Sequence, residues 1–508
     1  MTEFSLSLRV AADDMAKAQS ALAAMAGRPR SARTTRTCTY YDTQDEALHR
    51  NDLALRVQRQ GRRYVQTVTA NGAGDKADQA GGTWEDTIAR QQPDPTAPEC
   101  GSRLGAALGA EALKPVFTTV VRHSTFALEP KPGTRIAVAV ERGEIRPVDG
   151  GDAVPIHDIA LSLEAGDPAV LWDVGLRLLE IVPFRIGTAS LAERGYRLVG
   201  KAKDMAPVHY AEPIRLDPAI TLDAALQIVG RRCLAMVLGN EDAALAGNLE
   251  GIHQIRVAVR RLRALLSALK PMLPDEHFRW ANGELKWLGK VYAAARNWDV
   301  FAYGLLAPVT GALARERDLE RLAKIVETRR RGAYERARET MQSARYTATV
   351  LRLSRWFEAR GWRDQPVTEE SARLVAPVGA AAPGILGRLY RKTRKRTRDF
   401  AACTPVERHQ LRIALKKLRY TVDFLESLYD AAAVKRFIKT VKPLQDDLGY
   451  ANDVRSAHML VADLDHDENA ALERAGGIVL GWHDRGIAES EARTEKHVTR
   501  FRRADPFW

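Results

Sequence analysis

The chain has 508 residues, of which 45% are hydrophobic and 28% charged, so it has enough apolar residues for the cores of two or three domains. Its four cysteines lie far apart and show neither a metal-binding nor a redox spacing, which argues against structural zinc and fits a reducing compartment. We find no signal peptide and no stretch approaching the about 20 apolar residues of a membrane span, so we expect a cytoplasmic, soluble protein.

The net charge of +13 is distributed unevenly along the chain. Residues 1–210 hold 26 Lys and Arg and 26 Asp and Glu, so the other 51 basic and 38 acidic residues, and the whole excess, follow residue 210. Such asymmetry suggests an anionic partner for the second part of the chain. The alternative is a solvated basic surface.

The first 202 residues read mainly as β-structure. Short runs with period-two alternation or β-rich composition occur at 3–10, 53–59, 64–69, 116–121, 135–140 and 159–163. Turn residues such as Gly61 and Gly133 separate these runs, and helical patterns interrupt them near 13–26 and 168–181. Many short strands at this spacing predict a barrel or a strongly curved sheet with flanking helices.

Residues 203–218 are predicted to be a linker, because their prolines interrupt both patterns. Residues 219–505 read as helix almost throughout, in two halves at 219–345 and 346–505. Helical spacing is clearest for the apolar residues Ile252, Ile255, Val259, Leu262, Leu266 and Leu269. Long helices joined by short loops predict an all-α bundle.

A segment of eleven residues occurs once in each helical half. Residues 253–263 and 409–419 both read His-x-x-Arg-x-x-x-basic-basic-x-Arg. Their charged residues are His253, Arg256, Arg260, Arg261 and Arg263 in the first copy and His409, Arg412, Lys416, Lys417 and Arg419 in the second. A repeat of this kind indicates a duplicated structural unit.

The spacing of each copy places the first, fourth, eighth and eleventh residues on one helix face, over about 15 Å. Like charges on one face repel, so we infer an anion that offsets this cost. Arginine suits phosphate because its planar fork donates two hydrogen bonds, and histidine gains charge beside a phosphate. The alternatives are a solvated basic face and, for each histidine, a satisfied side chain at a helix start.

Further charged segments accompany the repeat. The run 388–398 has seven basic residues in eleven positions, and a solvated helix is its alternative interpretation. A Leu-Gly segment with Asn and Asp follows each copy, at 288–300 and 444–454. Its acids could orient the repeat arginines or serve a structural role. The accessory candidates for contact with a polyanion are Arg296, Arg391, Lys392, Arg394 and Lys395.

With these segments, residues 219–505 resemble a CHAD domain, a helical family named for its conserved histidines. The resemblance implies two pseudo-symmetric four-helix halves with a basic groove that binds inorganic polyphosphate. It also implies that some members associate with polyphosphate granules.

Residues 1–202 resemble a CYTH domain, the fold of the triphosphate tunnel metalloenzymes. The matching segments include Tyr41-Asp42-Thr43, Leu55-Arg56, Trp84-Glu85 and Ala192-Glu193-Arg194-Gly195-Tyr196. The family implies an eight-stranded antiparallel β-tunnel in which carboxylates bind Mg²⁺ or Mn²⁺ and Lys or Arg bind a triphosphate. Arg56, Arg59 and Arg122 match basic tunnel positions, and structural pairing with acidic neighbours is their alternative role.

This sequence departs from the CYTH pattern where the chemistry resides. Ser5, Ser7, Ala137, Ala160 and Ser162 stand where the family has acids or a lysine, which leaves Glu3 and Glu85 as residual catalytic candidates. Two separated carboxylates make a poor Mg²⁺ site.

The sequence therefore predicts a polyphosphate-binding protein with a degenerate tunnel, without a metal or other cofactor. The alternatives are a Mg²⁺- or Mn²⁺-dependent triphosphatase and non-specific nucleic-acid binding. The sequence predicts neither a specific nucleic-acid partner nor an oligomeric state.

Overall fold

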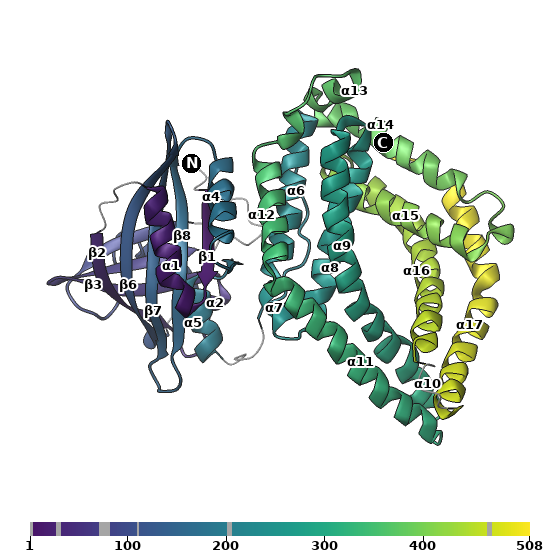
Figure 1. Ribbon diagram of the computed structural model, residues 1–508, viewed down its shortest axis with the longest axis horizontal. Helices are drawn as coiled ribbons and strands as arrows, with labels where there is room; N and C mark the ends of the chain where they lie inside the picture. The colour runs from purple at the N-terminus through teal and green to yellow at the C-terminus, as the bar shows by residue number, and fades with distance from the viewer. Residues whose placement is uncertain (1–3, 27–31, 71–81, 109–110, 201–205, 465–469) are drawn as a thin grey trace. The chain divides into compact units, whose positions relative to one another are not determined.

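The computed structural model describes residues 4–26, 32–70, 82–108, 111–200, 206–464 and 470–508. It divides into two compact units, Met1–Ala206 with Val350–Arg355 and Pro207–Thr349 with Trp356–Trp508. Strands dominate the first unit and helices form the second (Figure 1). The predicted fold class, a β-rich first part followed by an all-α second part, is confirmed.

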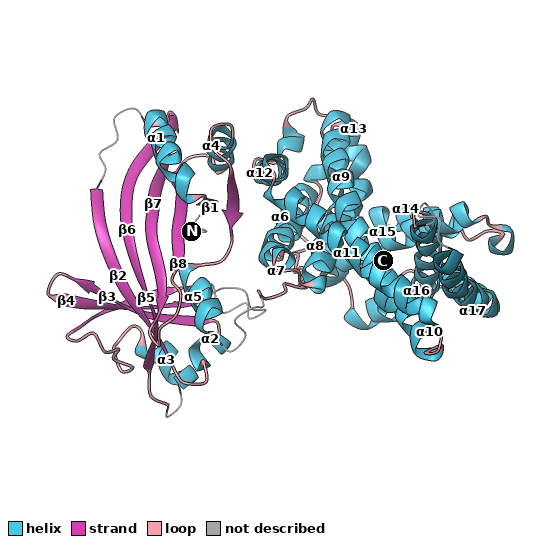
Figure 2. Ribbon diagram, turned by 60° about the horizontal axis from the view of Figure 1, so that its bottom comes forward, coloured by secondary structure: helices cyan, strands magenta, loops and turns pink. Residues whose placement is uncertain are grey.

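A single antiparallel sheet forms the frame of the first unit. Its strands are β1 (Ser5–Val10), β2 (Ala32–Asp42), β3 (Leu53–Gln60), β4 (Arg63–Ala70), β5 (Thr83–Ile88), β6 (Lys114–Lys131), β7 (Thr134–Pro147), β8 (Val154–Ala165) and β9 (Phe184–Gly187). They lie in the order β5-β4-β3-β2-β6-β7-β8-β1-β9. The long central strands curve strongly, as Figure 2 shows. Among the described strands no pairing joins β5 to the four-residue β9, so the implied tunnel is an open, curved sheet.

The two faces of this sheet are covered by different helices. Tyr40, Phe117 and Ile145 face one side, where they pack against Ala192 and Tyr196 of α5 (Leu191–Val199). We call this side the α5 face. The opposite side, which we call the α1 face, contacts α1 (Met15–Met25) and α4 (Ala169–Leu179), and α3 (Gly101–Leu108) covers it near β3 and β4. Positive φ angles at Gly61 and Gly133 confirm the predicted turns. The short helix α2 (Ala47–Arg50) follows β2.

Two sets of corresponding helices build the second unit. The helices are α6 (Leu222–Gly239), α7 (Glu241–Leu245), α8 (Leu249–Leu269), α9 (Asp275–Asp299), α10 (Ala307–Ala312), α11 (Arg317–Gln342), α12 (Ala344–Glu358), α13 (Glu369–Ala372), α14 (Val378–Lys395), α15 (Pro405–Leu425), α16 (Ala431–Ala462) and α17 (Ala470–Arg502). In the first half α6, α8, α9 and α11 pack in succession, and in the second α14, α15, α16 and α17 do the same. The halves meet where α8 packs on α15 and α11 on α17.

The predicted apolar stripe of α8 is a core face. Its six residues, from Ile252 to Leu269, are all at most 3% exposed. The repeated segments therefore lie on the two helices at the junction of the halves, which are helices 8 and 15 in Figure 1.

Candidate anion-binding site

Local capping sets where the two repeat helices begin. The Asn248 side chain accepts hydrogen bonds from the backbone N–H groups of Glu250 (2.9 Å) and Gly251 (3.4 Å), so α8 starts at Leu249. On α15, Thr404 and Glu407 form a reciprocal capping box and Pro405 occupies the first helical position. These caps place each repeat histidine in the first two turns of its helix.

Cations from both copies of the repeat converge between α8 and α15. We call this group the central cluster; its members are His253, Arg256, Arg260, Arg296, Arg412 and Lys416. Burial, together with the positive charges of Arg260, Arg412 and Arg256, lowers the pKa of Lys416 to about 6. Burial and the charges of Arg260 and Arg412 likewise lower the pKa of Arg256 to about 9. These shifts mean that the cations repel one another in partly desolvated positions.

The central cluster also holds donors without partners. Burial, Arg296 and then Arg256 lower the pKa of His253, and its Nδ1 is buried without a hydrogen-bond partner in the described structure. The same holds for Nε of the buried Arg412. Asp453 is the carboxylate that opposes the pKa shifts of Arg256, Arg412 and Lys416. Glu250 likewise opposes the shift of His253. The cations of the cluster outnumber these two carboxylates, which leaves a site that a polyvalent anion would stabilise.

A pseudo-two-fold relation between α8 and α15 explains why some repeat residues lie outside the cluster. The repeat offset of 156 residues maps Arg261 onto Lys417 and Ser267 onto Asp423. Arg261 forms an ion pair with Asp423 (3.6 Å), and Lys417 Nζ donates to Ser267 Oγ (2.9 Å). The two contacts are thus equivalent under an approximate two-fold relation between the halves.

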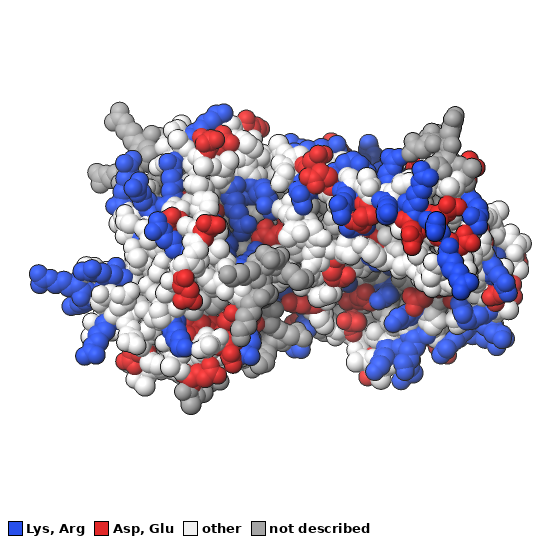
Figure 3. Space-filling model, turned by 90° about the horizontal axis from the view of Figure 1, so that it is seen from below, with Lys and Arg blue, Asp and Glu red and all other residues white. Residues whose placement is uncertain are grey.

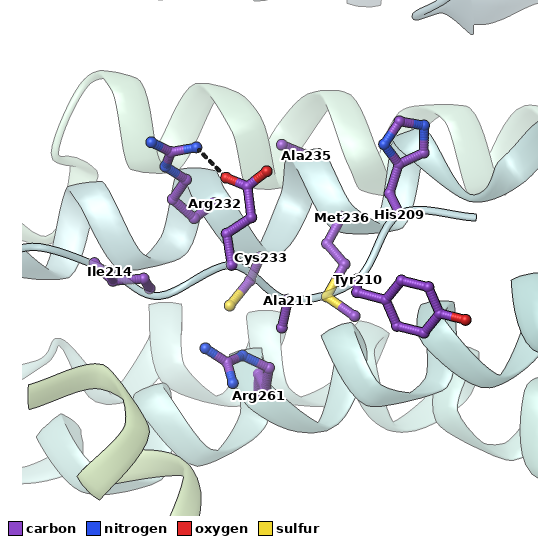
Figure 4. Close-up of a pocket in the computed structure, with 10 residues that line it drawn as sticks. His209, Tyr210, Ala211, Ile214, Arg232, Cys233, Ala235, Met236 and Arg261 are labelled. Atoms are coloured by element: carbon purple, nitrogen blue, oxygen red, sulfur yellow. Dashed lines mark hydrogen bonds and ion pairs between the residues drawn. The ribbon is translucent and has the colours of Figure 1, made fainter. Parts of the chain in front are cut away.

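Arg261 departs from the prediction that it binds the anion. Its side chain is 8% exposed and packs over the Phe424 ring with 4.8 Å to the centroid. Figure 4 shows its guanidinium directed toward Cys233, in a small pocket of about 120 Å³. Arg261 therefore connects α8 to α15. Adjacent side chains on a helix point about 100° apart, so Arg261 does not face the same way as Arg260.

A second basic region forms around Lys417, with Arg263 and Lys392 as its neighbours. Arg263 donates from Nε to Asn282 Oδ1 (3.3 Å). Burial raises the pKa of Asp423, and the charge of Arg419 beside it opposes this shift. Burial, then Lys392, Arg263 and Arg396, lowers the pKa of Lys417. The exposed accessory residues on α14 are Arg391, Lys392, Arg394 and Lys395. This region is next to the cluster through Arg263, whose pKa burial and Arg260 lower.

His409 is placed differently from its counterpart His253. Its Nδ1 lies 2.7 Å from Asn452 Oδ1, and it lines a pocket of about 450 Å³ with Arg408 and Arg455. The Asn-Asp segment of the second half thus supplies both the partner of His409 and the acid of the central cluster. In the first half Asp299 instead accepts from Tyr334 (2.9 Å) and lies 3.6 Å from Arg330. Sequence reasoning left open which of these acids would orient the repeat.

The α5 face of the sheet shows where the tunnel acids are missing. Ser7, Ala160 and Ala139 lie side by side across β1, β8 and β7, and Ser5, Ser162 and Ala137 do so one step along. The next row pairs Glu141 with Asp158, which forms an ion pair with Arg194. Burial and then Asp158 raise the pKa of Glu141. Sequence reasoning did not single out Asp158.

Of the two residual catalytic candidates, the structure describes Glu85. Glu3 lies outside the described residues, and Glu85 is exposed and accepts from Thr67 Oγ1 (3.2 Å). Among the residues that the structure describes, no three His, Cys, Asp or Glu side chains gather as a metal site would require.

Only one of the three predicted tunnel arginines lies on the α5 face. Arg56 pairs in register with Tyr40 and Thr67 on that face, and its Nε is buried without a partner in the described structure. Arg59 is three residues further along β3 and therefore points to the other face. Arg122 is paired with Thr35 and also lies on the α1 face. The prediction that all three contact a tunnel ligand is wrong for these two, because side chains alternate along a strand.

The surface is less one-sided than the net charge suggests. On the face drawn in Figure 3, Lys and Arg side chains are interspersed with Asp and Glu over both units. Within the described part of the chain, no helix has the length and hydropathy needed to cross a bilayer.

Comparison with known proteins identifies both parts. A family model for the CHAD domain matches residues 229–462 and one for the CYTH domain matches residues 28–196. An inorganic triphosphatase from Haemophilus influenzae is 27% identical over 167 residues, 32% of this chain and 46% of that protein. The chain thus matches about half of that relative's length.

Solved structures give the fold of the helical unit. The CHAD domain from the plant Ricinus communis is 24% identical with a TM-score of 0.52, over 59% of this chain and 98% of that one. PptA from Streptomyces chartreusis is 15% identical with a TM-score of 0.41, over 56% of this chain and 98% of that one. The first likeness shows the helical fold.

Proposed function

We propose that this protein, in which a CYTH domain is followed by a CHAD domain, binds inorganic polyphosphate at the central cluster. The observation that carries the proposal is the convergence of both repeat copies on one site. Burial and the neighbouring arginines lower the pKa of Arg256, Arg412 and Lys416, and Asp453 is the carboxylate that opposes all three shifts. A chain of closely spaced phosphates supplies several negative charges to such a group at once.

The chemistry of the donors favours phosphate oxygens. Guanidinium forks match two oxygens of a phosphate, and Nδ1 of His253 and Nε of Arg412 have no partner in the described structure. Polyphosphate carries no bases, and none of the six members of the central cluster is an aromatic residue of the kind on which single-stranded nucleic acids stack. The proposal therefore places polyphosphate before nucleic acid as the partner.

The test measures binding of long-chain polyphosphate to the full chain in EDTA, at several salt concentrations. We expect affinity to fall steeply with salt, by analogy with counterion release from nucleic acids. The variant R256A/R260A/R412A/K416A should lose at least about 2 kcal/mol of binding free energy, given about 1 kcal/mol or more for each hydrogen bond to a charged group.

A matched control removes four exposed arginines elsewhere in the helical unit, as R279A/R331A/R338A/R485A. This variant has the same formal net charge as the first, so it reports the non-specific contribution of charge. Equal losses in both variants, or no loss in the first, would rule out the central cluster as the site. Competition with DNA at equal charge concentration separates polyphosphate binding from nucleic-acid binding.

The same site would bring the protein to polyphosphate granules in cells that contain them. A fluorescent fusion of the full chain should co-localise with granules, and the R256A/R260A/R412A/K416A substitutions should disperse it. Continued co-localisation of that variant would assign granule association to another surface.

A metal-dependent triphosphatase is the second candidate, favoured by the likeness to the Haemophilus influenzae enzyme. The residues of the α5 face do not fit the metal that this chemistry requires. Two rows of that face carry Ser and Ala, and Asp158 of the next row is held by Arg194. We therefore expect the CYTH domain to be a non-catalytic module.

Phosphate release from tripolyphosphate with Mg²⁺ or Mn²⁺ decides between these functions. We expect no turnover above that of a buffer blank. Turnover that disappears in E3A or E85A would establish a triphosphatase and overturn the non-catalytic assignment.

A further inference from the structure

A second cationic pocket lies in the strand-rich unit, on the α1 face of the sheet. It has a volume of about 310 Å³ and takes its walls from β2, β6, β7 and α1. The residues that matter for its chemistry are Gln19, Arg33, Thr35, Arg122, Ser124 and Arg142. Because Arg56 and Glu141 point to the α5 face, this pocket is separate from the tunnel that the CYTH fold implies.

Strand register brings the three arginines of this pocket together. Arg122 lies directly opposite Arg142 on β7 and opposite Thr35 on β2. Arg33 is opposite Ser124, two residues along the same face of β6. Like charges that face each other across strands destabilise a sheet. An anion held between them would reverse the sign of that interaction.

No carboxylate compensates these charges within the part of the chain that the structure describes. The pocket wall contains neither Asp nor Glu, and none of the ion pairs found among the described residues involves Arg33, Arg122 or Arg142. Arg142 donates weakly from Nη2 to Gln19 Oε1 (3.4 Å), while its Nε is buried without a partner. Arg33 and Arg122 are exposed, so their guanidinium groups are accessible to a ligand.

We propose that this pocket binds a short phosphate-bearing anion, which is free pyrophosphate or tripolyphosphate or the end of a longer polyphosphate chain. Three guanidinium groups can each donate two hydrogen bonds to phosphate oxygens, and the Thr35 and Ser124 hydroxyls add further donors. The volume is at the lower end of ligand pockets and suits a small anion. Binding here needs no metal ion and does not depend on the central cluster.

The test uses the full chain with the central cluster removed by R256A/R260A/R412A/K416A, so that helical binding does not mask the pocket. Pyrophosphate, tripolyphosphate and long-chain polyphosphate are titrated into this parent by calorimetry in EDTA. Adding R122A/R142A should weaken binding at least tenfold, while R122K/R142K, which keeps the charge and loses the fork, should weaken it less. If tripolyphosphate binds and long-chain polyphosphate does not, the ligand is a free oligophosphate. If both bind with the same affinity when the concentration is expressed as chain ends, the ligand is the end of a polyphosphate chain.

The matched control R59A/R62A removes the same charge from exposed positions on and beside β3 and should change affinity less than twofold. If R122A/R142A does not fold, the single variant R122A at the exposed position decides, with an expected loss of at least threefold. The proposal is overturned if the parent binds none of the three anions or if R122A/R142A binds as the parent does. A loss of affinity in R56A equal to that in R122A/R142A would likewise overturn it, because the anion would then lie on the α5 face.

Discussion

Replacing Lys416 by methionine should stabilise the free protein while weakening its binding of polyphosphate. In the folded chain, burial and three neighbouring arginines lower the pKa of this amine from 10.5 to about 6. At pH 7.5 the Lys416 amine is therefore mainly neutral in the folded protein, whereas in the unfolded chain it is protonated, because pH 7.5 lies about three units below its normal pKa. At about 1.4 kcal/mol per unit, this disfavours folding by up to about 4 kcal/mol. Methionine has a similar length and no charge, so we expect K416M to gain at least about 2 kcal/mol.

The dependence on pH provides the sharper measurement. Between pH 6 and 10.5 the unfolded chain binds a proton at Lys416 that the folded chain does not, so wild-type stability rises with pH over this window. The K416M variant should lack this slope, and K439M, at an exposed position of α16, should keep it. Urea unfolding followed by helical circular dichroism from pH 6.5 to 9.5 measures both. A wild-type slope retained in K416M, with no gain in stability, would refute the burial and repulsion inferred for the cluster.

Three further predictions concern the same units. Polyphosphate binding at pH 8 should be accompanied by proton uptake, because a bound anion raises the lowered pKa of Lys416. Calorimetry in buffers of different ionisation enthalpy measures this uptake. For the same reason, polyphosphate affinity should fall as pH rises above 6. R261A should destabilise the helical unit by about 1–3 kcal/mol, since it removes the ion pair of the half-buried Asp423 and leaves only the neighbouring Arg419 charge to oppose its burial. Polyphosphate affinity should change less than twofold, and a large loss of affinity would return Arg261 to the binding site. G195A should destabilise the strand-rich unit by several kcal/mol in thermal unfolding, because the added methyl group would overlap the Phe117 ring, and an unchanged melting temperature would contradict this packing.

The sequence predicted the helices that carry the repeat because their apolar residues follow one period over many turns. It could not assign each cation to a partner, since helical spacing defines a face but not what covers it. Arg260 and Arg261 are neighbours in sequence, yet one joins the central cluster and the other pairs with Asp423. That difference depends on how α15 crosses α8, which no local pattern records.

For the strands, the sequence did not show to which face of the sheet each side chain points. The run 116–121 is apolar or Thr on both sides, so alternation did not show that Arg122 points away from Arg56. Strand β2 was not predicted because Arg33, Arg36 and several threonines make it polar. The Ser and Ala residues on the α5 face, in contrast, are those that the sequence analysis named as replacing acids or a lysine. Their strands have clear alternating patterns, and the strand register places these residues side by side.

The packing of α8 on α15, with Arg261–Asp423 and Lys417–Ser267 as equivalent contacts, gives the site an approximate two-fold axis. Under the repeat relation Arg256 corresponds to Arg412 and Arg260 to Lys416, so an elongated anion meets the same four basic positions in either direction. Inorganic polyphosphate has identical ends and reads the same in both directions, whereas a nucleic acid strand has a 5′ and a 3′ sense. A duplicated helix pair is therefore matched in symmetry to a polymer without polarity, and a directional chain could use both halves equally only by reversing its sense at the axis.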